Sequence, residues 1–245
     1  MEFEGKSVIV TGGAQGIGQA IALRFASAGA RISILDVDVS NASFPGFEDS
    51  ICLFSGDVAN SLDVERFVSD VAKRTGRIDI LVNNAGIIRD NVIWRMSEDE
   101  FDSVLRVNLK GPWLLSKQVI PIMKGQDYGR IVNIVSRAWL GNFGQSNYSS
   151  SKGGLVSLTR VLALELARFN ITVNAVAPGL IDTPMTRSLS PETFDKLIAA
   201  QPGKRAGKPE DIAHAVAFFA SQEAGFISGQ VLHVDGGKSI GSTVF

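Results

Sequence analysis

The sequence predicts a single α/β domain whose parallel sheet is covered by helices on both faces. Short runs rich in β-branched residues alternate with longer helical segments along the whole chain. Most of these runs are almost continuously apolar, which is typical of strands buried on both faces. The length of 245 residues suits one domain, and no linker, repeat or low-complexity segment divides residues 1–245.

Seven short runs are expected to form the strands of this sheet. They are SVIVT (7–11), RISILD (31–36), ICLFSGDV (51–58), IDILVNNAG (78–86), GRIVNIVS (129–136), ITVNAVAPG (171–179) and QVLHVDGG (230–237). Helices are expected over 16–28, 62–74, 98–123, 146–169 and 209–220. Parallel strands need long right-handed crossovers, and this alternation supplies them.

Two connections depart from this alternation. Between residues 36 and 51, Pro45, Gly46 and scattered serines argue against a full helix. The segment at about 180–208 is the longest insertion after any strand, and its prolines and glycines frame a short helix at about 191–200. Long segments of this kind are often functional, so we expect a lid over a substrate site.

Composition excludes several classes of function. The net charge is −1 with the positive charges spread along the chain, so neither nucleic acid nor a membrane surface is an expected partner. No apolar run is long enough to span a membrane and no signal peptide is evident, which predicts a cytoplasmic protein. Cys52 is the only cysteine, His214 and His233 are interpreted as structural, and no spacing indicates a metal site.

A glycine-rich loop follows the first predicted strand directly. In VIVTGGAQGIG, Gly12, Gly16 and Gly18 stand where the chain turns into the first helix, a context that lets backbone amides approach a pyrophosphate. Asp36 ends the second strand, where a carboxylate accepts hydrogen bonds from ribose hydroxyls and repels a 2′-phosphate. Neither Gln15 nor Val37 supplies a compensating positive charge, so NAD is favoured over NADP.

The octet NYSSSKGG places Tyr148 and Lys152 four residues apart, on one face of a predicted helix. Ser136 ends the fifth strand, at the sheet edge where such folds bind ligands, and Asn108 lies in the preceding helix. Oxidation of a secondary alcohol removes a hydride and a proton. A tyrosine whose pKa is lowered by an ammonium group can take that proton, and a serine can hold the substrate oxygen.

These motifs together resemble the short-chain dehydrogenase/reductase family, in its single-domain branch. TGGAQGIG, NNAG at 83–86, Asn108, Ser136, YSSSK and PGLIDT at 178–183 occur in the family's order over about residues 6–237. The resemblance implies a Rossmann-type doubly wound sheet of seven parallel strands. It also implies that Tyr148 is the general acid/base, that Lys152 binds the nicotinamide ribose and lowers the phenol pKa, and that Asn108 holds a water in a proton relay.

The resemblance also implies a set of residues along the bound cofactor. These are Gly12, Gln15, Gly16, Ile17, Gly18, Asp36, Asp57, Val58, Asn84, Ala85, Gly86, Tyr148, Lys152, Pro178, Gly179, Ile181 and Thr183. Asp57 and Val58 are expected beside the adenine, residues 84–86 beside the adenosine ribose, and Ile181 with Thr183 beside the carboxamide.

Within this family, NNAGIIRDNVIWRMSEDEFDSVLRVNL and ISGQVLHVDGG look most like 3-oxoacyl-carrier-protein reductases. Those enzymes usually take NADPH and use two arginines to hold the carrier protein. Here Asp36 favours NAD, Arg130 matches only the first arginine, and Phe169 stands at the second position with Arg168 one residue earlier. The expected activity is therefore interconversion of another secondary alcohol and ketone. Reduction of an acyl thioester, or oxidation of a 3-hydroxyacyl thioester, remains the alternative, and a non-catalytic NAD-binding protein is the other.

The substrate pocket is the part of the site that the sequence describes least. Ser136, Tyr148 and Arg137 are the expected substrate contacts, with Arg137 a candidate for binding a carboxylate. Further candidates are Trp94, Trp139, Leu140, Gln145 and Met185. The run at 155–169 is apolar on more than one face, which predicts a homo-oligomer, and the family resemblance implies a tetramer. Neither the substrate nor the physiological direction follows from these residues.

Overall fold

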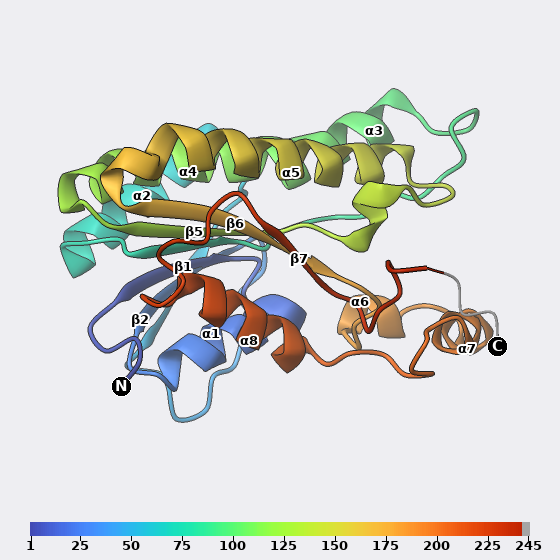
Figure 1. Cartoon of the computed structure of the whole chain (residues 1–245), viewed down its shortest axis with the longest axis horizontal. Helices are drawn as coiled ribbons and strands as arrows, with labels where there is room; N and C mark the ends of the chain where they lie inside the picture. Colours follow the sequence, from blue (N-terminus) through green and yellow to red (C-terminus); the bar gives the residue numbers. More distant parts are fainter. Residues whose placement is uncertain (242–245) are drawn as a thin grey trace.

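The computed structural model describes residues 1–241 and contains a seven-stranded sheet with helices on both faces (Figure 1). The strand order is β3-β2-β1-β4-β5-β6-β7, and every neighbouring pair is parallel. This confirms the predicted fold class. The chain reverses its direction of progress across the sheet between β1 and β4, which leaves a crevice at their carboxyl ends.

β1 and β2 have the predicted bounds, and the other five strands are shorter than the runs that predicted them, mainly at their carboxyl ends. Their bounds are β1 Ser7–Thr11, β2 Arg31–Asp36, β3 Ile51–Ser55, β4 Ile80–Asn83, β5 Gly129–Ile134, β6 Ile171–Pro178 and β7 Val231–Val234. Gly56 after β3 and Val135 after β5 each make one more bond to the neighbouring strand, and the segments that follow β3, β4 and β5 then form loops. Those loops carry most of the residues that the sequence associated with ligands.

The helices follow the predicted order closely. Their bounds are α1 Gly16–Ala26, α2 Ser61–Thr75, α3 Glu98–Leu105, α4 Gly111–Gln126, α5 Ser146–Leu166, α6 Pro184–Arg187, α7 Pro191–Ala199 and α8 Pro209–Ala220. As expected, no helix forms between β2 and β3. In the described chain, the predicted helix over 98–123 is divided by a π-helix, Arg106–Lys110, which joins α3 to α4.

Apolar side chains fill both faces of the sheet. In Figure 1, α1 and α8 cover one face and α2, α4 and α5 the other. Successive residues of a strand point to opposite faces, so Val8 and Val10 pack with Phe25 of α1 while Ile9 packs with Leu115 of α4. All five are fully buried, and each contributes about 2 kcal/mol of hydrophobic stabilisation. The sheet is therefore a rigid support for the loops at its ends.

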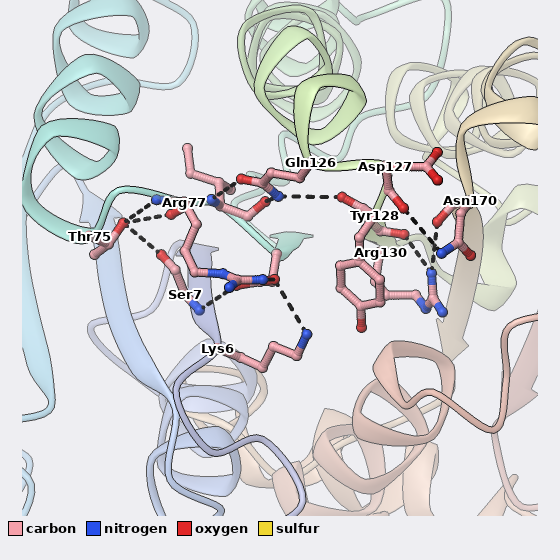
Figure 2. Close-up of polar contacts among 12 residues, drawn as sticks. Lys6, Ser7, Thr75, Arg77, Gln126, Asp127, Tyr128, Arg130 and Asn170 are labelled. Carbon is pink, nitrogen blue, oxygen red and sulfur yellow. Dashed lines mark hydrogen bonds and ion pairs between the residues drawn. The ribbon is translucent and has the colours of Figure 1, made fainter.

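The amino-terminal edge of the sheet carries a network of paired charges (Figure 2). Asp79, which is fully buried just before β4, accepts hydrogen bonds from Arg77 at 2.7 and 2.6 Å and from the Ser7 amide at 2.9 Å. Lys6 lies 3.5 Å from the same carboxylate. The ring of Tyr128 lies between two cations, with Lys6 Nζ 4.0 Å and Arg130 Cζ 4.5 Å from its centroid. This edge is fixed by its own contacts.

Over residues 1–241, the chain forms no helix with the length and hydrophobicity that a membrane crossing requires. Within the same range, no three His, Cys, Asp or Glu side chains gather in a way that could hold a metal ion.

Candidate active site

The glycine-rich loop occupies the crevice at the carboxyl ends of β1 and β4. Gly12 and Gly16 have φ values of 62° and 57°, in the left-handed region that glycine adopts without strain. A Cβ on Gly18 would lie 2.1 Å from the Gly12 carbonyl oxygen, and one on Gly12 would lie 2.8 Å from Ala85 Cα. The loop thus makes a turn that only glycines allow, at the start of α1. It fits a dinucleotide pyrophosphate against the helix N-terminus.

Asn84 fastens this loop to the end of β4. Its Nδ2 donates to the carbonyl oxygens of Thr11 at 3.0 Å and Gly12 at 2.8 Å. The Thr11 hydroxyl in turn accepts from the amides of Asn84 and Ala85. Both N–H groups of the Asn84 side chain are thereby used within the protein, whereas its Oδ1 can still accept a hydrogen bond, for example from a ribose hydroxyl.

Asp36 lies over the mouth of the glycine-rich loop at the end of β2. Its Oδ2 accepts from the Ala14 amide at 3.0 Å, which holds the carboxylate beside the pyrophosphate turn. Its Oδ1 lies 3.4 Å from the Asp38 amide, so this oxygen still has acceptor capacity. Val37 is 68% exposed and Gln15 is exposed, and neither brings a positive charge. The position matches the one predicted for a ribose-binding carboxylate.

The other residues predicted to contact the cofactor differ in how accessible their side chains are. Thr183, the N-cap of α6, lies 3.8 Å from the Cβ position of Gly16, so the segment after β6 reaches the glycine-rich loop. Val58 and Ile181 are 5% and 4% exposed and pack into the core, which leaves mainly their backbone for contacts. Asp57 accepts from the Ala59 amide at 2.8 Å.

Tyr148 and Lys152 lie on one face of α5, as the octet predicted. Lys152 Nζ is 5.7 Å from the centroid of the Tyr148 ring. The ammonium group is buried and donates to the Ile134 carbonyl at the end of β5, at 2.8 Å. It also lies 3.6 Å from the Cβ position of Gly86, beside the NNAG segment. The lysine therefore links the helix, the sheet and the cofactor crevice.

The electrostatics of this pair differ from the expected arrangement in one respect. Burial raises the pKa of Tyr148 above 10.0; the Ser136 hydroxyl lowers it by hydrogen bonding, and the negative charge of Asp90 raises it further. Burial also lowers the pKa of Lys152 to about 8. In the protein groups alone the pKa of Tyr148 is raised, because burial of the phenol outweighs the hydrogen bond from Ser136. That Lys152 lowers the phenol pKa stays a prediction.

Asn108 lies on the π-helix and is fully buried. Its Oδ1 accepts from the Ile87 amide at 2.8 Å, and its Nδ2 donates to the Ile87 carbonyl at 3.0 Å and to Ser151 Oγ at 3.3 Å. The side chain thus pins the loop after β4 to α5, one turn from Tyr148. A π-helix inside a longer helix often marks a functional position. The sequence identified Asn108 but not this clamp.

Ser136 stands two residues beyond β5 and is the N-cap of a short 3-10 helix, Arg137–Leu140. Its Oγ accepts from the Ala138 amide at 3.1 Å, which fixes the side chain at the carboxyl edge of the sheet. Arg137 is half-buried, and its Nε has no hydrogen-bond partner within residues 1–241. Trp139 donates to His233 Nε2 at 3.2 Å, so these two residues join the loop after β5 to β7.

Two residues that the sequence did not single out also belong to this site. Asn147 is fully buried, and its side chain bonds the carbonyls of Arg89 at 2.7 Å and Glu100 at 3.2 Å. Asp90, in the loop after β4, accepts from Gln145 Nε2 at 2.8 Å. An isolated acidic residue in a loop is ordinarily a solvated charge, so only its position in the fold reveals Asp90.

Known proteins are similar to this chain over almost its whole length. The family model described as Enoyl-(Acyl carrier protein) reductase matches residues 12–239. The (2S)-[(R)-hydroxy(phenyl)methyl]succinyl-CoA dehydrogenase subunit BbsD of Thauera aromatica is 43% identical, with 98% of this chain and 99% of that protein covered. The 3-oxoacyl-[acyl-carrier-protein] reductase FabG of Thermotoga maritima is 42% identical, with 98% and 100% covered.

The crystal structure of levodione reductase superposes with a TM-score of 0.91 at 36% identity, covering 97% of this chain and 99% of that one. The chain belongs to the short-chain dehydrogenase/reductase family. As a member of this family it is an oxidoreductase that binds a nicotinamide cofactor and interconverts a secondary alcohol and a ketone. The names of these relatives give different alcohols and ketones as substrates, so membership alone does not identify the substrate of this chain.

Proposed function

We propose that the protein is an NAD(H)-dependent dehydrogenase/reductase in which Tyr148 is the general acid/base. The observation that carries this proposal is a chain of contacts at one sheet edge. Asp36 bonds the glycine-rich loop, the loop packs against Ala85, and Lys152, beside Tyr148 on α5, lies 3.6 Å from the Cβ position of Gly86. When bound, the cofactor supplies or accepts the hydride. The protein residues move the proton and hold the reacting oxygen.

In the proposed mechanism, Ser136 holds the substrate oxygen next to the phenol. During ketone reduction, Tyr148 donates its hydroxyl proton to the carbonyl oxygen, and during alcohol oxidation the phenolate accepts it. Lys152, which bonds Ile134 O, has further N–H donors for the nicotinamide ribose. Asn108 keeps the loop after β4 in register with α5. Its side-chain amide bonds both backbone groups of Ile87, and its Oδ1 keeps one lone pair that a relay water could use.

The proposed preference for NAD rests on Asp36. A carboxylate held by the Ala14 amide would bond ribose hydroxyls and repel a 2′-phosphate. The test is kcat/KM for a panel of ketones with NADH and with NADPH. NADH should be preferred, and Asp36→Ala should narrow that preference while retaining turnover. A preference for NADPH in the wild-type protein would overturn the assignment.

Oxidation or reduction of an acyl thioester is the second candidate, because BbsD and FabG are dehydrogenases or reductases of such compounds by name. Arg130, the residue that matches a carrier-protein arginine, is 2% exposed and donates to the carbonyls of Gly129, Asn170 and Ser221. It is therefore a poor docking group for a carrier protein, which favours a coenzyme A ester. Higher kcat/KM for acetoacetyl-CoA than for simple ketones would support this candidate.

A homo-oligomer and a substrate lid complete the proposal. A groove of about 490 Å³ between α4 and α5 is lined by Trp113, Ile120 and Leu162, and Leu164 nearby is 82% exposed. A second copy of the chain would cover these side chains, and sedimentation of a 26.2 kDa monomer alone would contradict it. The lid is the segment at about 180–208, whose helix α7 has no buried residue.

A further inference from the structure

One charged residue in the site works against the chemistry proposed for it. Asp90 is exposed in the loop after β4, and the surrounding protein still raises its pKa through loss of hydration. Its negative charge raises the pKa of Tyr148, which disfavours the phenolate needed for alcohol oxidation. No lysine, arginine or histidine among residues 1–241 forms an ion pair with it.

Asp90 is held in place firmly by its neighbours. Gln145, which is 9% exposed, donates to Asp90 Oδ2 at 2.8 Å and accepts from Asn142 at 2.9 Å. The flanking residues are fixed as well, because Asn147 bonds the Arg89 carbonyl and the Asn91 amide donates to the Gly144 carbonyl at 2.9 Å. Asp90 thus has a defined position beside the start of α5. Its partner Gln145 precedes Tyr148 by three residues in the chain.

The bond to Gln145 does not by itself require a charge. An asparagine would offer the same acceptor oxygen, and it would not raise the pKa of the catalytic phenol. The second oxygen, Oδ1, has no hydrogen-bond partner within the described residues. The charge of Asp90 therefore opposes alcohol oxidation and is not needed for its bond to Gln145. Such exceptions are expected at functional sites, and we expect this charge to act on the choice of substrate.

The surroundings of Asp90 narrow the kind of substrate that it selects. Ile93 and Trp94, on the same loop, are 71% and 75% exposed, and Phe143, on the adjoining loop after β5, is 86% exposed. These side chains offer apolar surface to an entering molecule. The Asp90 carboxylate adds a charged hydrogen-bond acceptor to this surface, and it would repel an anion.

We propose that Asp90 is a specificity-determining residue that selects uncharged substrates bearing an N–H or O–H donor near the reacting carbonyl and rejects those bearing a carboxylate there. This inference rests on the proposed function of the same site. It assigns the free Oδ1 to the substrate donor. It also leaves no role for Arg137 in binding a substrate carboxylate.

Three derivatives of 3-oxobutanoic acid that differ only at the carboxyl end test the proposal with NADH at neutral pH. Acetoacetamide carries an N–H donor, ethyl acetoacetate has only acceptors, and acetoacetate carries the negative charge. The wild-type enzyme should reduce acetoacetamide with the highest kcat/KM and acetoacetate with the lowest. Asp90→Asn, which keeps an acceptor for Gln145, should raise kcat/KM for acetoacetate relative to ethyl acetoacetate about tenfold. The same substitution should lower kcat/KM for acetoacetamide relative to that for ethyl acetoacetate several-fold, because a charged acceptor forms a stronger hydrogen bond than a neutral one.

Asp102→Asn is the matched control, since Asp102 is an exposed acid on nearby α3. It should leave both ratios unchanged. If the wild-type enzyme and an active Asp90→Asn variant have the same two kcat/KM ratios, the role of Asp90 is overturned while the proposed function stands. Preferred reduction of acetoacetate that depends on Arg137 would also overturn it. No NADH-dependent reduction of any of the three ketones or of the wider panel would overturn the proposed function together with this inference.

Discussion

The two edges of the sheet differ in how fully their charged groups are hydrogen-bonded. At the amino edge, Asp79 is surrounded by Arg77, Lys6 and the Ser7 amide, and both of its oxygens are bonded (Figure 2). At the carboxyl edge, the Lys152 ammonium has one carbonyl partner, and Asp90 has one amide partner. A charge satisfied within the protein contributes to the fold. A charged group that still has free hydrogen-bonding positions is available to a ligand. Loss of hydration also shifts the pKa of such a group, as it does for Lys152 and Asp90.

The largest expected effect at the carboxyl edge is that of Tyr148→Phe. Loss of the hydroxyl removes the proton donor, so kcat for ketone reduction should fall by about 10³-fold, within the range for a general acid. Binding of NADH, followed by fluorescence titration, should persist. Tyr128→Phe, at the other edge and at the only other tyrosine of the chain, should leave kcat unchanged because its ring stays between Lys6 and Arg130. Equal activity of the two variants would refute the assignment.

Asp79→Asn should affect stability instead of turnover. It removes the anion from a buried pair and should lower the free energy of unfolding by about 3 kcal/mol, the lower end for such a change because Arg77 and Lys6 are partly exposed. Urea denaturation measures this loss. Glu192→Gln, which breaks the exposed pair with Lys196, should change stability little. A drop in kcat of the folded Asp79→Asn protein would mean that the two edges are coupled.

Lys152→Met should separate stability from activity at the carboxyl edge. A pKa of about 8 in place of 10.5 means that burying the charged lysine costs on the order of 3 kcal/mol. The cost is fully present below pH 8. Between about pH 8 and 10.5 the folded lysine loses its proton while the unfolded one keeps it, so stability rises with pH.

The methionine variant should therefore be inactive yet more stable at pH 7, and its advantage over wild type should shrink as the pH approaches 10.5. Denaturation midpoints of the two proteins across this pH range test the idea. Lys73→Met, at a lysine whose side chain is 77% exposed, is the control and should show no such convergence. A methionine variant less stable than wild type at every pH would contradict the expected cost.

The smallest expected effect is a shift in a pH profile. The charge of Asp90 raises the pKa of Tyr148, so Asp90→Asn should lower that pKa. Alcohol oxidation needs the deprotonated phenol, and its kcat/KM should therefore begin to rise at a lower pH in the variant. Asp102→Asn should keep the wild-type profile. A shift of the Asp90→Asn profile to higher pH would show that the carboxylate stabilises the phenolate instead.

The sequence predicted the fold class, the order of the elements and the main site residues because each follows from local patterns. Buried parallel strands read as apolar runs, and Gly12, Gly18 and the Tyr148–Lys152 spacing obey local steric and helical rules. Several strand ends were overextended, since an apolar residue can stay buried beyond the end of a strand, as Val135 does.

Features that depend on contacts between distant segments could not be read in this way. The clamp of Asn108 on Ile87, the bond from Gln145 to Asp90 and the burial of Arg130 all join residues far apart in the chain. The same limit applies to the raised pKa of Tyr148, because it depends on how deeply the phenol is buried.

The π-helix that carries Asn108 makes the length of the segment from α3 to α4 critical. One wide turn in an otherwise α-helical segment has the geometric effect of one extra residue. Deleting a single residue there would restore a regular helix but turn the asparagine by about 100° relative to whichever half of the segment kept its packing. Insertions and deletions should therefore be tolerated in surface loops of this protein but not within residues 98–126, although the sequence of this stretch is that of an ordinary helix.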